Sequence, residues 1–269
     1  MSRYLYFGAH PDDPEVCFAG TALQLTAAGH VVQYVSLTNG DRGHHRMPPE
    51  ELARRRYGEA QKSASLSGIA EYRILDNHDT ELEASLENRH RLIRIIREFR
   101  PDVVITHRSC DYHPDHRAAG QLVMDASFLI GVPHCCPDSP VLRKTPVFCC
   151  SRDSFLSPVP FRADAVVDIT GVIDRKADLL LCHESQFLEW LPWIERNMDL
   201  DKESMSPDAR RAFVREHWLE PFNGCVAAAH PETVRKYFRE PPRYAEAFEI
   251  SEYGRRISAD EFQALMTSF

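Results

Sequence analysis

The sequence predicts an α/β fold: a Rossmann-like, doubly wound and mostly parallel sheet with a helical, aromatic-rich C-terminal extension. Two observations support this prediction. In residues 1–180, short apolar runs rich in β-branched and aromatic residues alternate with longer segments of helical period. The chain has 269 residues, of which 43% are hydrophobic, and is therefore long enough to bury one sizeable core.

The expected strands are short apolar runs bounded by turn residues. They cover Tyr4–Gly8, Val31–Thr38, Tyr72–Leu75, Val103–Thr106 and Ala165–Asp168. The expected helices have apolar residues at helical spacing and cover about 16–28, 49–66, 86–99, 115–127 and 172–185. A strand order of 3-2-1-4-5 makes the first and fourth strands neighbours.

The expected helix over 86–99 shows the pattern well. Its apolar stripe consists of Leu86, Leu92, Ile93, Ile96 and Phe99, with charged residues opposite. Pro101 ends the helix, and the following "DVVITH" predicts a strand buried on both faces. Residues 131–160 are rich in Pro, Cys and Ser, and we expect a long irregular excursion there.

The expected organisation is a Rossmann-like main domain over 1–187 and an extension over 188–269 packed on the same domain. In the extension, "FLEWLPWIERNMD" carries Trp190 and Trp193, and "SPDARRAFVREHWLEPF" reads as a capped helix with an aromatic end. We expect the extension to act as a lid or an oligomer contact. The two tryptophans suit either stacking on a sugar ring or burial in a subunit interface.

Composition argues against several classes of protein. The 32 Lys and Arg against 40 Asp and Glu give a net charge of −8, and no basic run suits a nucleic acid. No apolar run reaches the roughly 18 residues of a membrane span, and the N-terminus lacks a signal-peptide pattern. We therefore expect a cytoplasmic protein, with its eight cysteines reduced and mostly buried.

Charged residues follow the first expected strand directly. The stretch "YLYFGAHPDDPE" places His10, Asp12 and Asp13 at the carboxyl end of a buried apolar run. In a parallel α/β sheet, ligands bind beyond the carboxyl ends of strands, where the strand order reverses. This stretch is therefore a candidate site.

A second polar cluster has the same construction after the fourth expected strand. In "THRSCDYHPDHRAAG", His113, Asp115 and His116 lead into a helix. If the first and fourth strands are neighbours, the two clusters face each other across one crevice. Taken singly, each motif also suits a helix-capping turn, but both together after strands of one sheet favour a functional site.

Two imidazoles and one carboxylate with an open position form the donor set of a catalytic Zn²⁺ site, and Fe²⁺ accepts the same set. We expect His10, Asp13 and His116 to bind the metal and Asp12 to act as general base toward the attacking water. His113 is placed to stabilise an oxyanion or to protonate a leaving group. Asp115 is counted with the catalytic groups as a carboxylate that holds an imidazole by its other nitrogen.

These residues carry a resemblance to a known family. The motifs HPDD-x-E, "AGT" at 19–21 and HPDH-R-x-x-G resemble those of the PIG-L/LmbE family of metal-dependent N-acetylglucosamine de-N-acetylases. "LTNGDRG", "ELARRRYGEAQKSASLSG", "HDTEL", "KADLLLCHESQ" and "YAEAF" are similar to further family segments. The resemblance covers most of 1–187 and residues 244–248, and only loosely 188–240.

The resemblance implies a zinc-dependent hydrolase that removes the N-acetyl group from an N-acetylglucosamine-containing glycoconjugate and releases acetate and a free amine. It gives the metal ligands, Asp12 and His113 the roles stated above, and adds Arg56 and Asp79 as substrate-binding residues. Relatives often form homo-oligomers. Some place an active-site tyrosine two residues before the first His of HPDH, whereas here Asp111 holds that position and Tyr112 follows it.

Two other classes remain open on the residues alone. A non-heme Fe(II) oxygenase uses a similar His/Asp/His set, although by analogy such sites lie in antiparallel barrels. A non-catalytic sugar-phosphate or nucleotide binder suits the fold but leaves five metal-type residues unexplained. The sequence has no G-x-G-x-x-G after the first strand and no Walker A motif.

Overall fold

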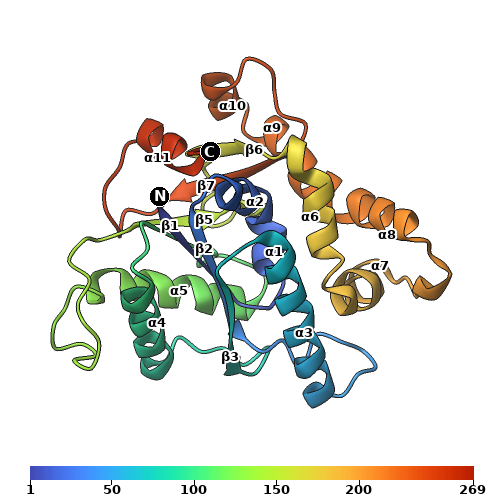
Figure 1. Ribbon diagram of the computed structural model, residues 1–269, viewed down its shortest axis with the longest axis horizontal. Coiled ribbons are helices and arrows are strands. Elements are labelled where there is room, and N and C mark those ends of the chain that lie inside the picture. The colour runs from blue at the N-terminus through green and yellow to red at the C-terminus, as the bar shows by residue number, and fades with distance from the viewer.

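One seven-stranded sheet forms the centre of the molecule (Figure 1) in the computed structural model, which describes residues 1–269. The strands are β1 (Arg3–Gly8), β2 (Val31–Thr38), β3 (Glu71–Asn77), β4 (Val103–Thr106), β5 (Val147–Ser151), β6 (Ala165–Asp168) and β7 (Ala245–Ile250). Their order is β3-β2-β1-β4-β5-β7-β6. Only β7 runs antiparallel to its neighbours. The sheet is therefore mostly parallel, as predicted.

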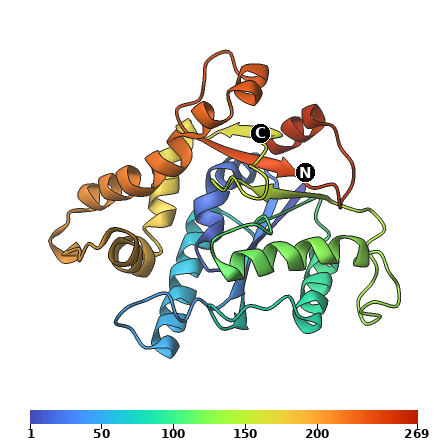
Figure 2. The ribbon, with the colours of Figure 1, turned by 180° about the vertical axis from the view of Figure 1, so that it is seen from behind.

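Helices cover both faces of this sheet (Figure 2). They are α1 (Asp13–Cys17), α2 (Ala19–Ala27), α3 (Pro49–Ser67), α4 (Leu86–Phe99), α5 (Pro114–Leu129), α6 (Ile173–Leu180), α7 (Leu191–Arg196), α8 (Pro207–Val214), α9 (Val226–Ala229), α10 (Pro231–Tyr237) and α11 (Ala259–Met266). Wider π-helical turns cover Ser185–Trp190 and Arg215–Gly224. No helix is both long and apolar enough to cross a membrane.

Side chains of β1 point alternately to the two faces of the sheet, and each face is covered by helices, as in a doubly wound fold. Tyr4 and Tyr6 join the core beneath α2 and α6, whereas Leu5 and Phe7 join the core beneath α4 and α5. Because successive side chains of a strand point to opposite faces, an apolar run such as β1 is expected when helices cover both faces. The Rossmann-like fold class is confirmed.

The first four strands take the predicted order, but the prediction of which strand lies next to the fourth was wrong. The strand beside β4 is β5, which lies inside the segment 131–160 that we expected to be irregular. The predicted fifth strand, Ala165–Asp168, is instead the edge strand β6 and pairs only with β7. β5 is short, follows Pro146, and has Cys149, Cys150 and Ser151 among its five residues, so its apolar signal is weak.

Helix predictions were closer, with two differences. The helix expected over 16–28 is divided into α1 and α2 at Phe18, and the helix expected over 172–185 ends at Leu180. Helix α4 has the predicted bounds, but Leu86 is 58% exposed because it is the first residue of the helix. The other four members of its predicted stripe are buried.

The C-terminal extension contributes to the same sheet. Its strand β7 lies between β5 and β6. Ser206 caps α8 by accepting a hydrogen bond from the backbone N–H of Ala209, as the predicted capped helix requires. The boundary between residues 187 and 188 stays a prediction.

A buried ion pair fixes β7 against two helices. The Glu246 carboxylate accepts hydrogen bonds from the backbone N–H groups of Gly20 and Thr21 at 2.9 and 2.8 Å, at the start of α2. Lys176 of α6, which is fully buried, donates to the same carboxylate at 2.7 Å. This carboxylate satisfies the free N–H groups of a new helix N-terminus, which explains why α1 and α2 are separate.

We predict that Lys176→Met lowers the free energy of unfolding by about 3–5 kcal/mol, because the Glu246 charge then stays buried without a partner. The matched control is Lys144→Met. Lys144 pairs with Asp102 at 2.7 Å, but its side chain is 73% exposed. Such surface pairs contribute at most about 1 kcal/mol. Urea unfolding checks both variants, and equal losses would contradict the structural role given to the buried pair.

Candidate metal centre

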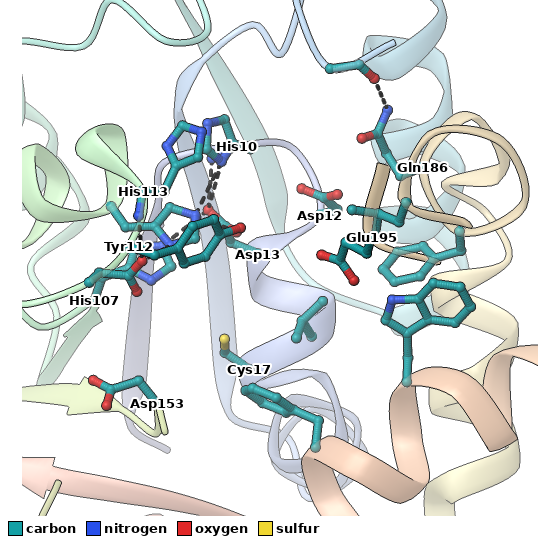
Figure 3. Close-up of a pocket in the computed structure, with 18 of the residues that line it drawn as sticks. His10, Asp12, Asp13, Cys17, His107, Tyr112, His113, Asp153, Gln186 and Glu195 are labelled. Carbon is teal, nitrogen blue, oxygen red and sulfur yellow. Dashed lines mark hydrogen bonds and ion pairs between the residues drawn. The ribbon is translucent and has the colours of Figure 1, made fainter. Parts of the chain in front are cut away.

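The pairing of β1 with β4 brings the two predicted motifs together. The strands are parallel, with Tyr6 opposite Ile105, so both chains leave the sheet at the same edge. The loop after β1 carries His10, and the loop after β4 leads to His113 at the start of α5. Figure 3 shows these side chains gathered on one side of a pocket, with Asp12 facing them. The crevice predicted from the sequence is present.

The three predicted metal ligands converge. His116 Nε2 lies 3.3 Å from His10 Nδ1 and 3.4 Å from Asp13 Oδ1. His10 Nδ1 lies 3.7 Å from Asp13 Oδ2. The three side chains come from the loop after β1, from α1 and from α5.

The two separations from His116 fit a small divalent cation, and the 3.7 Å from His10 to the other Asp13 oxygen is slightly longer. Tetrahedral ligands at about 2.0–2.1 Å from Zn²⁺ are about 3.3–3.4 Å apart. The mixed imidazole and carboxylate donor set also suits zinc or iron. Other donors lie close by, because His113 groups with His10 and His116, and His107 groups with Asp13 and His116.

Carboxylates hold the other nitrogens of both imidazole ligands. His10 Nε2 lies 3.3 Å from Asp115 and 3.2 Å from Asp79. His116 Nδ1 lies 3.2 Å from Asp111. Burial disfavours charge on His10, but its hydrogen bonds to Asp115 and Asp79 raise its pKa to about 10. Such outer carboxylates fix the ring orientation and increase ligand basicity.

The role of Asp115 thus has a geometric basis. The side chain is fully buried and also accepts hydrogen bonds from the backbone N–H groups of Thr80 and Leu82 at 2.7 and 3.2 Å. These bonds anchor the loop after β3 to α5. Asp115 positions His10 rather than facing the open pocket.

Sequence reasoning assigned no role to two further residues of the centre, His107 and Asp111. His107 Nε2 lies 3.0 Å from Asp13 Oδ2, and its ring stacks on that of His116 with centroids 4.2 Å apart. Asp111 holds His116 and also accepts the His113 backbone N–H at 2.9 Å. The available signal for His107 was its place directly after β4, at the carboxyl edge.

Asp12 lies beside the ligands and makes its own ion pair. Arg56 Nη2 donates to Asp12 Oδ1 at 2.9 Å, and Arg56 Nη1 lies 3.7 Å from Asp79. Burial raises the pKa of Asp12, with the Asp13 charge acting in the same direction and Arg56 opposing both. Arg56 and Asp79 were expected to bind substrate, and both line the pocket. Arg56 also contacts Asp12, and Asp79 also contacts His10.

His113 is both the cap of α5 and a pocket residue. Its Nδ1 accepts the Asp115 backbone N–H at 3.2 Å, so the helix-capping interpretation applies to this motif as well. Because that lone pair is engaged, the neutral ring carries its proton on Nε2. Burial and the neighbouring His10 lower the pKa of His113, which favours this neutral form.

The pocket beside the centre has a volume of about 530 Å³, within the usual range for small-molecule sites. The extension supplies one wall, with Trp190, Trp218 and Phe222 among its residues. Trp193 is not part of the lining and stacks on His45 with ring centroids 4.5 Å apart. Tyr112 lines the pocket and is 68% exposed.

The sequence matches a known family and several known proteins. The family model for PIG-L, described as GlcNAc-PI de-N-acetylase, matches residues 5–127. The diacetylchitobiose deacetylase of Thermococcus kodakarensis is 32% identical over 200 residues, covering 72% of this chain and 74% of that protein. A probable N-acetyl-α-D-glucosaminyl L-malate deacetylase of Bacillus anthracis is 27% identical, covering 79% and 92%.

Solved structures show the same fold. The N,N'-diacetylchitobiose deacetylase of Pyrococcus horikoshii matches with a TM-score of 0.71 and 26% identity, over 94% of this chain and 84% of that one. The 4-carboxy-2-hydroxymuconate hydratase of Pseudomonas putida also gives a TM-score of 0.71, over 96% and 98% of the chains. Its identity is 20%, so it shows the fold alone.

The fold and the donor set define an α/β protein with a possible His and Asp metal site at the strand-order switch point. The chain belongs to the PIG-L family of de-N-acetylases, as the resemblance in its motifs indicated. Proteins of this family are metal-dependent, and His and Asp side chains of the crevice form groups that could hold a metal ion.

We predict that Asp115→Asn weakens metal binding about 10–100-fold, because His10 loses the carboxylate that orients its ring. Competition with a chelator of known affinity measures the change. The control is Asp125→Asn on the same helix, since that carboxylate contacts only Arg89, at 3.5 Å. Unchanged affinity in a folded Asp115→Asn protein would argue against the outer carboxylate role.

Proposed function

We propose that this chain is a zinc-dependent hydrolase that removes the N-acetyl group from an N-acetylglucosamine-containing glycoconjugate. Water adds its oxygen to the amide carbonyl carbon, the C–N bond breaks, and acetate and a free amine leave. The observation that carries the proposal is the position of Asp12. It is a buried carboxylate beside the three ligands, and it faces a pocket large enough for a small molecule.

His10, Asp13 and His116 would hold the metal, which we propose is Zn²⁺, with Fe²⁺ as the alternative for the same donors. When bound, the metal supplies a Lewis acid for the amide carbonyl and allows a nucleophile to form near neutral pH. The sheet is parallel rather than an antiparallel barrel, which weakens the Fe(II) oxygenase interpretation. Membership of a family of de-N-acetylases likewise weakens the interpretation of the chain as a non-catalytic sugar-phosphate or nucleotide binder.

Asp12 acts as the base that takes a proton from the attacking water and then passes it to the amine. Burial and the nearby Asp13 charge raise its pKa, which increases its strength as a base. The Arg56 guanidinium lowers the pKa of the same carboxylate and so opposes the effect of burial. Its hydrogen bond from Nη2 also fixes which oxygen is free to accept the proton.

His113 donates a hydrogen bond to the developing oxyanion. Because Nδ1 is bonded to the Asp115 N–H, the ring presents its Nε2–H without needing a positive charge. A donor fixed in advance at the position where negative charge develops contributes several kcal/mol in typical enzymes. This arrangement favours oxyanion stabilisation over the second role considered for His113, protonation of the leaving group.

Acetate and primary-amine release from a panel of N-acetylglucosamine glycosides and chitooligosaccharides tests the proposal. The zinc-loaded protein should release both products in equal amounts. Asp12→Asn should be slower by about 10²–10⁴-fold, the usual contribution of a general base. Asp102→Asn, a change at the opposite edge of the sheet, is the control.

Two outcomes would contradict the proposal. One is release by Asp12→Asn at the wild-type rate. The other is no release from any member of the panel by protein whose metal content has been confirmed.

The position of Arg56 depends on a glycine. Gly40 has φ +68°, and a Cβ there would lie 2.5 Å from Arg56 Nη1. We predict that Gly40→Ala lowers kcat/KM about 10–100-fold by displacing the guanidinium from Asp12. Gly29 is the matched control because it has φ +83° and no neighbour within 4 Å of a built Cβ.

Both alanine variants should lose about 1–2 kcal/mol of stability from backbone strain. Only Gly40→Ala should lose activity. Similar activities for the two variants would mean that Arg56 does not position the base.

The aromatic wall gives a prediction about substrate binding. We expect Trp190→Ala to raise KM about fivefold to tenfold, because an aromatic contact of about 1 kcal/mol is lost from the pocket. Trp193→Ala should have a smaller effect on KM, since Trp193 lies outside the lining and stacks on Trp190, with ring centroids 5.4 Å apart. Steady-state kinetics on the preferred substrate compare the two. A larger effect at Trp193 would place the sugar elsewhere.

Three further expectations stay predictions. They are direct substrate contact by Arg56 and Asp79, a homo-oligomeric state and a cytoplasmic location. Sedimentation analysis addresses the second, and cell fractionation the third.

A further inference from the structure

A second cluster of metal-type side chains lies away from the site described above. His90 on α4 and the adjacent Cys135 and Cys136, in the loop between α5 and β5, place one donor atom each within 4.8 Å of one another. This loop enters β5 at the amino edge of the sheet, opposite the edge that carries the candidate metal centre. Figure 1 and Figure 2 show the loop running beside α4.

The loop is held rigidly by one buried arginine. Arg97, 2% exposed, donates all five of its guanidinium N–H groups to backbone carbonyls. The acceptors are the carbonyl oxygens of Leu129, Ile130, Val132, Cys136 and Ser139, at 2.9–3.1 Å. Arg94 adds two bonds to Asp138 at 2.7 and 3.1 Å. The cysteines are thus carried by a segment fixed to α4.

The histidine of the cluster lies on the same face of α4 as these two arginines. His90, Arg94 and Arg97 are spaced four and three residues apart, so they lie on one face of α4. The Cys136 thiol lies 3.8 Å from the His90 carbonyl oxygen, which places the thiol against the helix. Cys136 has φ +51°, an uncommon backbone conformation for a residue other than glycine. The two cysteines and the histidine are therefore preorganised.

A bound cation, and not the nearby arginines alone, would have to favour the thiolate forms of the two cysteines. Burial and the neighbouring Cys135 raise the pKa of Cys136, and Arg94 and Arg97 oppose this increase only in part. Coordination of a cation would release the two thiol protons to solvent, and the cation would balance the negative charge of the thiolates.

We propose that His90, Cys135 and Cys136 form a second metal site that binds a thiophilic d¹⁰ cation of the Zn²⁺ or Cd²⁺ class. Two thiolates and one imidazole are the protein ligands of known three-ligand zinc sites, with a fourth position open to water. Soft sulfur donors separate this site chemically from the nitrogen and oxygen donors of the candidate centre. The other vicinal pair, Cys149 and Cys150, lies within β5 and forms no such cluster.

Titration with Cd²⁺ under reducing conditions tests the site, with His116→Ala as background to weaken the other centre. Thiolate-to-cadmium charge-transfer absorption should appear and saturate with one added equivalent. His90→Ala should weaken Cd²⁺ binding by at least about tenfold, since even an outer partner typically contributes that much. Cys135→Ser should abolish the absorption, and Cys225→Ser, at a half-exposed cysteine outside the cluster, should leave it unchanged.

A second readout does not depend on absorption. Cd²⁺ should raise the melting temperature of the His116→Ala protein, because it binds the folded loop, and should not do so after Cys135→Ser. Cys135 is only partly buried, so this variant is expected to fold. Absence of charge-transfer absorption in the reduced protein, or its persistence in Cys135→Ser, would overturn the proposal.

Discussion

The parallel pairing of β1 with β4 is the constraint on which the rest of this structure depends. It places the carboxyl ends of both strands at one edge of the sheet, so that residues far apart in the sequence share one crevice. Helix α5 packs closely against the backbone that follows β4. A Cβ at Gly120 would lie 2.6 Å from the His107 carbonyl oxygen, so a larger residue would push α5 and His116 away from the β1 loop.

Within the crevice, acids and bases alternate so that few charges lack a partner. Asp115 holds His10, Asp13 contacts both His116 and His107, and Asp12 pairs with Arg56. Arg56 also lies near Asp79, which contacts His10, so the proposed base and the proposed metal ligands belong to one network. In a buried network each polar group depends on its neighbours, and loss of one partner is therefore costly.

The sequence predicted the parts of this network that depend on local pattern. The apolar runs of β1 and β4 and the stripe of α4 are continuous in the chain, and the two histidine motifs follow strands directly. β7 was not predicted because it inserts between β5 and β6 from the C-terminal part of the chain. His107 and Asp111 were missed because each acts on a ligand that only the tertiary fold brings within reach.

The central claim is that the loops after β1 and β4 together form one metal centre. Anomalous diffraction from zinc-soaked crystals tests it most directly. The account predicts a zinc peak enclosed by His10 Nδ1, the Asp13 carboxylate and His116 Nε2, with Asp12 beside it and not coordinated. No peak at this position in crystals that hold zinc elsewhere, or a peak coordinated by Asp12 in place of Asp13, would contradict it.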